Sequence, residues 1–336
     1  MFCDEDDLVQ ERLGMRRLAV FVIAATATVA FATGGKAADV PPIVPITMAA
    51  AEEPAKVTAM VELFGGGTHM TLGVVGDPEC QGCHNLGLGF GGEGRAAWEI
   101  SPTLSMQLNV WAEHWSGQSS FEGGDENDPW SANRMGIGTH LTYESGGFQF
   151  GGFASIGTRS AEGIFLSVDP ATFANFGLEA AVNANMFRLY AQTGYTIPSA
   201  PSGLRDFWAD EGIREFYGRL VGTFYPNPNI ALSANAGVEV VLGTAPWLPG
   251  YVLIWGAEAQ FQFSGTPLYL LASYQGSLSR NAADFQIVAH VVRLGIGLNV
   301  GSPDLQTRDR AVGLTDYNCT FGVRSTPGCG IFNGFD

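Results

Sequence analysis

The stretch that decides the fold is YVLIWGAEAQFQF, residues 251–263. Every second residue in it is apolar, from Tyr251 through Trp255 to Phe263, and the residues between them include Glu258 and Gln260. Successive side chains of a β-strand point to opposite faces, so this period of two indicates a strand with one oily and one polar face. The ranges 268–278 and 288–300 alternate in the same way.

The length of these runs separates two all-β architectures. The runs cover about eleven to fourteen residues, whereas strands of globular proteins usually stop near five or six. A tilted strand needs about ten residues to cross the outer membrane, with apolar side chains toward lipid and polar ones toward a lumen. Tyr251 and Phe261 share a face and lie roughly 25 Å apart along the membrane normal, the height of an apolar band. A two-sheet sandwich would also alternate, but the length favours a membrane barrel.

The rest of the chain repeats a strand, a tight turn, a strand and a longer loop. Strand signals cover 85–100, 103–115, 134–144, 147–158, 173–182, 187–197, 213–225 and 229–243, besides the first one from Val57 and the three runs above. Outer-membrane barrels combine short periplasmic turns with longer external loops. The sequence therefore predicts a single closed antiparallel transmembrane β-barrel of about twelve strands. The glycines of residues 87–94 would let the sheet bend as it closes.

The N-terminal region resembles an export signal. Met15, Arg16 and Arg17 precede the apolar run 18–33, and Ala37 offers a cleavage point. Residues 1–37 are thus predicted to be an export signal, with 1–14 an over-called start; an uncleaved inner-membrane helix is the alternative. The predicted order continues with a Pro/Ala-rich periplasmic lead-in at 38–56, the barrel at 57–300 and a C-terminal tail at 301–336.

The charge balance limits the possible partners. The formal net charge is −16, with 33 acidic against 17 basic residues, which argues against nucleic acid as a partner. Acidic groups in a pore would favour cations. Alternatively, the acidity keeps the loops soluble, and counting cannot separate loop acids from lumen acids.

Three features carry a resemblance to a known family. The export region ending in Lys-Ala-Ala-Asp-Val-Pro-Pro (36–42), the glycine- and aromatic-rich hairpins and the segment 305–310 resemble alphaproteobacterial porin-like outer-membrane proteins. The resemblance implies passive transport or an envelope role in a Gram-negative outer membrane, with lipid, small solutes and the barrel-assembly machinery as partners and oligomers possible. The chain departs from it by continuing past Val300 into a tail that either folds back or dangles.

The motif Cys80-Gln-Gly-Cys83-His84 is a candidate site for a cofactor, a metal or a disulfide. Its spacing is that of covalent haem attachment, with His84 as the iron ligand. No cytochrome-like domain surrounds it, so we expect disulfides instead: one in the first external loop at Cys80 and Cys83, and a second between Cys319 and Cys329 in the tail. A weakly held metal at Cys80, Cys83 and His84 is a further alternative; otherwise no cofactor is expected.

Charged residues on the polar faces of the strands are candidates for the lumen wall. They are Glu93, Arg95, Glu99, Glu113, Glu179, Arg188, Glu215, Arg219, Glu239, Glu258 and Arg293. Opposed charges across a water-filled pore would set its field and bias which ions pass. The competing interpretation is a plugged small barrel whose interior charges form salt bridges and conduct nothing.

No catalytic motif appears in the sequence. His140 and His290 lie within strands, but His290 shares the apolar face while Ser273 and Ser277 point inward, so we expect no enzyme. The sequence predicts a porin-like channel for passive diffusion of small cationic or neutral solutes. A non-conducting structural or surface-display barrel is the alternative, and a haem-bearing redox barrel the third hypothesis.

Overall fold

A computed structural model describes residues 57–74, 83–120, 128–162, 168–199, 214–242, 249–281 and 285–311. They form twelve strands and one short helix. The strands are β1 (Val57–Val74), β2 (Cys83–Ser101), β3 (Leu104–Ser120), β4 (Asp128–Ser145), β5 (Phe148–Glu162), β6 (Val168–Asn183), β7 (Phe187–Ser199), β8 (Arg214–Asn227), β9 (Ile230–Leu242), β10 (Pro249–Gln262), β11 (Leu268–Asn281) and β12 (Phe285–Val300). The helix is α3 (Leu305–Ala311).

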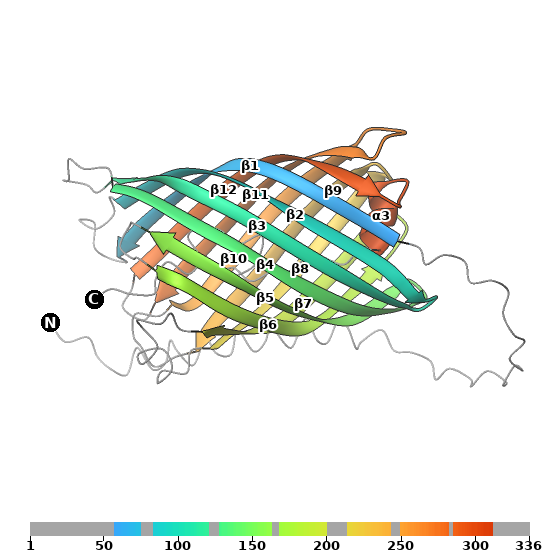
Figure 1. Ribbon diagram of the computed structural model, residues 1–336, viewed down its shortest axis with the longest axis horizontal. Helices are drawn as coiled ribbons and strands as arrows, with labels where there is room; N and C mark the ends of the chain where they lie inside the picture. The colour runs from blue at the N-terminus through green and yellow to red at the C-terminus, as the bar shows by residue number, and fades with distance from the viewer. Residues whose placement is uncertain are drawn as a thin grey trace, which may run out of the picture.

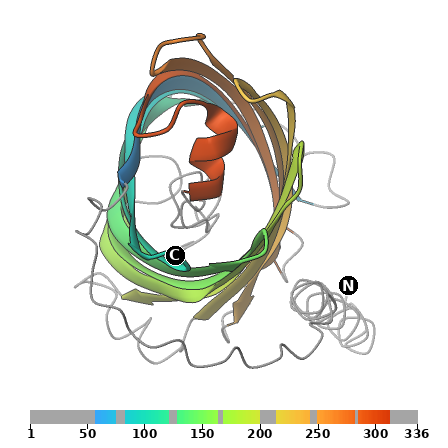
Figure 2. The ribbon, with the colours of Figure 1, turned by 90° about the vertical axis from the view of Figure 1, so that its right-hand side faces the viewer.

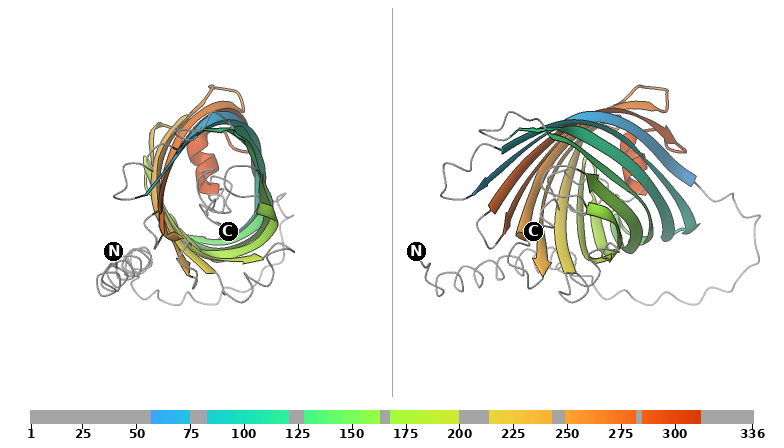
Figure 3. Two further views of the ribbon diagram at one scale, coloured as in Figure 1. Left: turned by 90° about the vertical axis from the view of Figure 1, so that its left-hand side faces the viewer. Right: turned by 60° about the vertical axis from the view of Figure 1, so that its left-hand side comes forward.

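The strands form a closed antiparallel barrel (Figure 1), so the predicted fold is confirmed. Each strand pairs with its sequence neighbours, and β1 pairs with β12 from Ala59–Val300 to Val74–Phe285 to close the sheet. Closure leaves no sheet edge with unsatisfied backbone groups, which is the condition for a sheet within a lipid bilayer. The strands are strongly tilted relative to the barrel axis (Figures 1 and 3).

The outer face of the barrel is apolar. Along β2, Leu88 is 74% and Phe90 65% exposed on the outer face. Glu93, which points to the inner face, is only 4% exposed. Aromatic clusters mark both ends of the apolar surface: Phe187 stacks on Phe224 beside the short turns, and Tyr195 packs on Phe216 toward the opposite end. An apolar surface of this extent is incompatible with water and suits a lipid belt flanked by aromatic girdles.

The inner face carries large aromatic side chains that lie against the wall. An added Cβ at Gly89 would come within 2.3 Å of the Trp115 indole, and one at Gly87 within 2.5 Å of Trp130. Both tryptophans belong to a buried cluster with Met70, Ala132, Ala289 and Val291. Besides any bending of the sheet, the glycines of β2 therefore provide room for inward-facing rings.

The described part of the tail, residues 301–311, folds back into the barrel. Helix α3 lies inside the barrel at one end (Figures 2 and 3), the end where β12 finishes and where the tight turns lie. Short turns of outer-membrane barrels face the periplasm, so α3 occupies the periplasmic end of the lumen. Among the described residues, no helix is long and apolar enough to cross a membrane.

Candidate functional site: the lumen and its periplasmic end

The inner face of the described strands gathers the charged side chains. The alternation of each strand turns them inward, and the buried charged residues of the strands and α3 are six glutamates and six arginines: Glu62, Glu93, Glu113, Glu179, Glu215, Glu239, Arg95, Arg134, Arg188, Arg219, Arg293 and Arg308. The two signs balance. The acidity of the chain therefore lies outside this buried set.

Most residues expected in the lumen wall are in this set. Nine of the eleven are buried; Glu258 is half-buried, and Glu99 is exposed at the turn end of β2. Sequence reasoning missed Glu62, Arg134 and Arg308. Glu62 lies between the apolar Val61 and Leu63, and this alternation could have predicted its inward position. Arg308, in contrast, lies in a segment without strand periodicity.

Glu113 on β3 joins distant parts of the wall. Its carboxylate accepts hydrogen bonds from Arg134 Nη1 at 3.1 Å, Arg293 Nη2 at 3.4 Å and Trp115 Nε1 at 3.0 Å. The Arg293 guanidinium also lies over the rings of Phe64, at 5.2 Å, and Trp115, at 5.5 Å. Because Arg134 comes from β4 and Arg293 from β12, this cluster bridges across β1 and β2.

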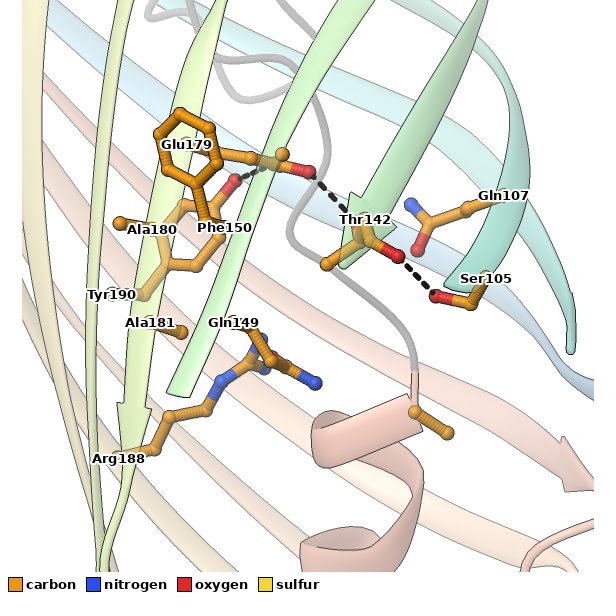
Figure 4. A pocket seen from close by; sticks show the side chains of 12 residues that line it. Ser105, Gln107, Thr142, Gln149, Phe150, Glu179, Ala180, Ala181, Arg188 and Tyr190 are labelled. Atoms are coloured by element: carbon orange, nitrogen blue, oxygen red, sulfur yellow. Dashed lines mark hydrogen bonds between the residues drawn. The ribbon is translucent and has the colours of Figure 1, made fainter. Parts of the chain in front are cut away.

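Glu179 on β6 is the centre of a second polar cluster (Figure 4). It pairs with His140 Nδ1 at 2.9 Å and accepts from Thr142 Oγ1 at 3.3 Å and from the Tyr190 hydroxyl. The chain of hydrogen bonds continues from His140 Nε2 to Asn109 Nδ2, at 2.8 Å. Glu179 also lines a small pocket, which extends to Ala311 at the end of α3.

We expect Glu179→Ala to destabilise the barrel by about 1–3 kcal/mol, because the substitution deprives buried polar partners of their acceptor. The temperature at which the folded barrel loses its fast gel migration measures the effect. Glu99→Ala, at an exposed position, is the matched control and should leave that temperature unchanged. Equal temperatures for both variants would show that the Glu179 cluster contributes nothing to stability.

Helix α3 begins at a side-chain cap. The Thr307 backbone N–H donates to Asp304 Oδ1 at 2.7 Å, which satisfies a free amide of the first turn. Leu305 is completely buried and packs in a cluster with Tyr225, Tyr269, Ala231 and Leu271. The cap and this apolar anchor fix where the helix starts against the wall.

Arg308 is the main polar anchor of α3. It is 2% exposed, donates from Nη2 to Gln260 Oε1 at 2.6 Å and lies 4.9 Å from the centre of the Tyr269 ring. Burial lowers the pKa of Arg308, but the Asp309 carboxylate, Tyr269 and the Glu62 carboxylate together outweigh burial and leave that pKa above its usual value. Tyr269 in turn donates to Glu62 at 2.7 Å. The docked helix thus carries a charged guanidinium into a buried polar network.

The other side of α3 reaches the opposite part of the barrel. Arg310 Nη2 donates to the carbonyls of Ala184, at 2.7 Å, and Asn185, at 3.1 Å, in the turn between β6 and β7. The Arg310 carbonyl accepts from Gln149 of β5. The helix therefore extends from the β10–β11 wall to the β5–β7 wall across the periplasmic end.

The cysteine predictions lie largely outside the described residues. Cys80, Cys319 and Cys329 are not among them, while Cys83 and His84 begin β2. Disulfides, haem and a metal at this motif stay predictions; an absorbance spectrum without a Soret band would contradict the haem. Within the described part of the chain, no group of three His, Cys, Asp or Glu residues is placed to hold a metal ion.

The residues considered for a hydrolase lie on different faces. His290 is on the outer face, where Tyr274 Oη lies 2.9 Å from its Nδ1, while Ser277 is buried on the inner face. His140 is committed to Glu179 and Asn109. The absence of enzymatic activity stays a prediction.

Comparisons with known proteins reveal likeness of structure. No protein-family model matches the sequence, and no curated protein is similar to it. An outer-membrane channel from Pseudomonas putida F1 is 11% identical, with 74% of this chain and 97% of that chain covered and a TM-score of 0.50. The translocator domain of the autotransporter NalP from Neisseria meningitidis is 13% identical, with 72% and 88% covered and a TM-score of 0.46. A FadL homologue from Pseudomonas aeruginosa is 9% identical, with 72% and 90% covered and a TM-score of 0.42.

At these identities the likeness concerns the fold. Together with the closed sheet and the apolar outer face, it defines the class of protein: a transmembrane β-barrel of the outer membrane of a Gram-negative bacterium. The resemblance to alphaproteobacterial proteins in particular stays a prediction.

Proposed function

We propose that the protein is a porin-like channel for passive diffusion of small neutral or cationic solutes across the outer membrane. The observation that carries the proposal is the division of the closed barrel between an apolar outer face and an inner face that is mostly polar and gathers the buried charged side chains. A polar interior behind an apolar outer face is the arrangement of barrels that enclose a water-filled channel.

The balance of charges supports neutral and cationic solutes together. Equal numbers of buried glutamates and arginines give the wall little net attraction for either sign. One connection at the external ends of the strands is strongly acidic in sequence: residues 121–127 contain Glu122, Asp125 and Glu126 with no basic residue. Acidic loops at a channel entrance raise the local concentration of cations.

Planar bilayer recording tests the proposal. The purified barrel should give discrete conductance steps, and a salt gradient should give a reversal potential of the sign expected for cations. Neutralising the buried Glu239 with Glu239→Gln should move that potential toward anions. No steps at any voltage, from the intact chain and from variants with α3 loosened, would contradict the channel.

The second candidate is a non-conducting structural barrel. The observation in its favour is that the interior charges are buried and lie in hydrogen-bonded clusters, as at Glu113. Under this function, substitutions such as Arg188→Ala would alter stability but no solute flux. The recordings above separate the two functions.

A further inference from the structure

The contacts of α3 join two sides of the periplasmic end. Arg308 and Leu305 hold it to β10 and β11, while Arg310 holds it to the β6–β7 turn. A third contact, from the Gln306 backbone N–H to the Pro228 carbonyl at 3.1 Å, fixes it to the β8–β9 turn. A helix held from several sides in this way lies in the path of any solute leaving the lumen.

The connection between β12 and α3 is built as a sharp bend. Gly301 has a φ of +79°, and an added Cβ would lie 2.0 Å from the Val57 carbonyl oxygen. Glycine is the residue that adopts this backbone conformation without steric cost. The bend turns the chain from the barrel wall into the lumen directly after the last strand pair.

The barrel does not depend on α3 for closure. The β1–β12 ladder closes the sheet from Ala59–Val300 onward, before the helix begins. The helix has seven residues, and a helix this short has no independent stability in water. Its docking is therefore maintained by its contacts with the wall and the turns, each of modest strength, rather than by the fold of the barrel.

We propose that α3 is a releasable gate: docked, it closes the periplasmic end of the channel, and undocked, it opens that end while the barrel stays folded. The inference rests on the proposed function, since a gate requires a conducting lumen. Arg308 and Leu305 hold the gate in its docked position, because Arg308 makes the buried polar contact with the wall and Leu305 makes the buried apolar one.

Release variants of the full chain test the gate in planar bilayers. Leu305→Ala and Arg308→Ala should each raise the fraction of time spent open at least about tenfold, because each removes a buried contact that exists only in the docked state. Leu294→Ala removes the same side chain from the lipid-facing surface and is the matched control. Fast gel migration of unheated protein verifies that every variant contains a folded barrel.

A reversible lock provides the converse measurement. Pro228→Cys with Gln306→Cys joins two positions whose backbones are hydrogen-bonded, in a chain whose other cysteines are replaced by serine. Oxidation should hold the channel shut, and reductant should restore opening. Steps of equal frequency in the wild type, release variants and oxidised lock would overturn the gate and leave the channel standing. No steps in any of them would overturn the channel itself.

Discussion

Gly66→Ala is expected to prevent closure of the barrel. Gly66 lies in the seam, by which we mean the β1–β12 pairing that closes the barrel. It is paired there with Arg293 of β12. A Cβ at this position would lie 2.1 Å from the Val292 carbonyl oxygen and 3.2 Å from the Arg293 Cα. Because both are backbone atoms, no side chain can rotate to relieve the clash, and β1 must separate locally from β12.

The loss should exceed the about 1–3 kcal/mol that an added methyl group usually costs in a packed interior, because separation of the seam exposes backbone groups to lipid. The measurement is gel migration of unheated protein extracted from membranes, where the fast-migrating folded form should disappear. Gly222→Ala is the matched control, since no atom other than those of its two chain neighbours lies within 4 Å of its added Cβ. If both variants retain the folded form equally, the close approach at Gly66 is not a requirement for closure.

The seam shows which part of the fold the sequence predicts. Strand number and facing follow from alternation, since lipid on one side and polar groups on the other act on every strand separately. Strand length was underestimated: the signal starting at Arg134 belongs to a strand that begins at Asp128. Asn133 on the outer face hydrogen-bonds His114 of β3 at 2.8 Å. Where polar residues replace apolar ones on the outer face, the alternation ends although the hydrogen-bonded ladder continues.

The candidate site was predictable in its members but not in its connections. The inward facing of Glu113 and Arg293 follows from parity within β3 and β12. Their contact does not, because it requires closure through β1 and β2. Helix α3 was unpredictable for a different reason: Leu305–Ala311 contains a single large apolar residue, so it has no amphipathic periodicity. Its position depends on a lumen that exists only after the barrel forms.

Glu113→Ala should lower the stability of the barrel more than Glu179→Ala does. Glu113 is 5% exposed, and its carboxylate accepts hydrogen bonds from Arg134, Arg293 and Trp115. Removing one partner of a buried ion pair typically costs about 3–5 kcal/mol, because the remaining charge stays desolvated. Two guanidinium groups here lose a shared counter-charge.

The temperature at which the folded barrel loses its fast gel migration should therefore fall further for Glu113→Ala than for Glu179→Ala. The Glu179 carboxylate has neutral hydrogen-bond partners and one histidine, whereas that of Glu113 has two guanidinium groups. Glu113→Gln preserves the shape and one acceptor, so its effect should be intermediate. The same variants add one net positive charge to the wall, and their reversal potentials should move toward anions. A stability loss without that movement would indicate that Glu113 holds strands together but does not border the path of ions; unchanged stability would contradict the bridging role itself.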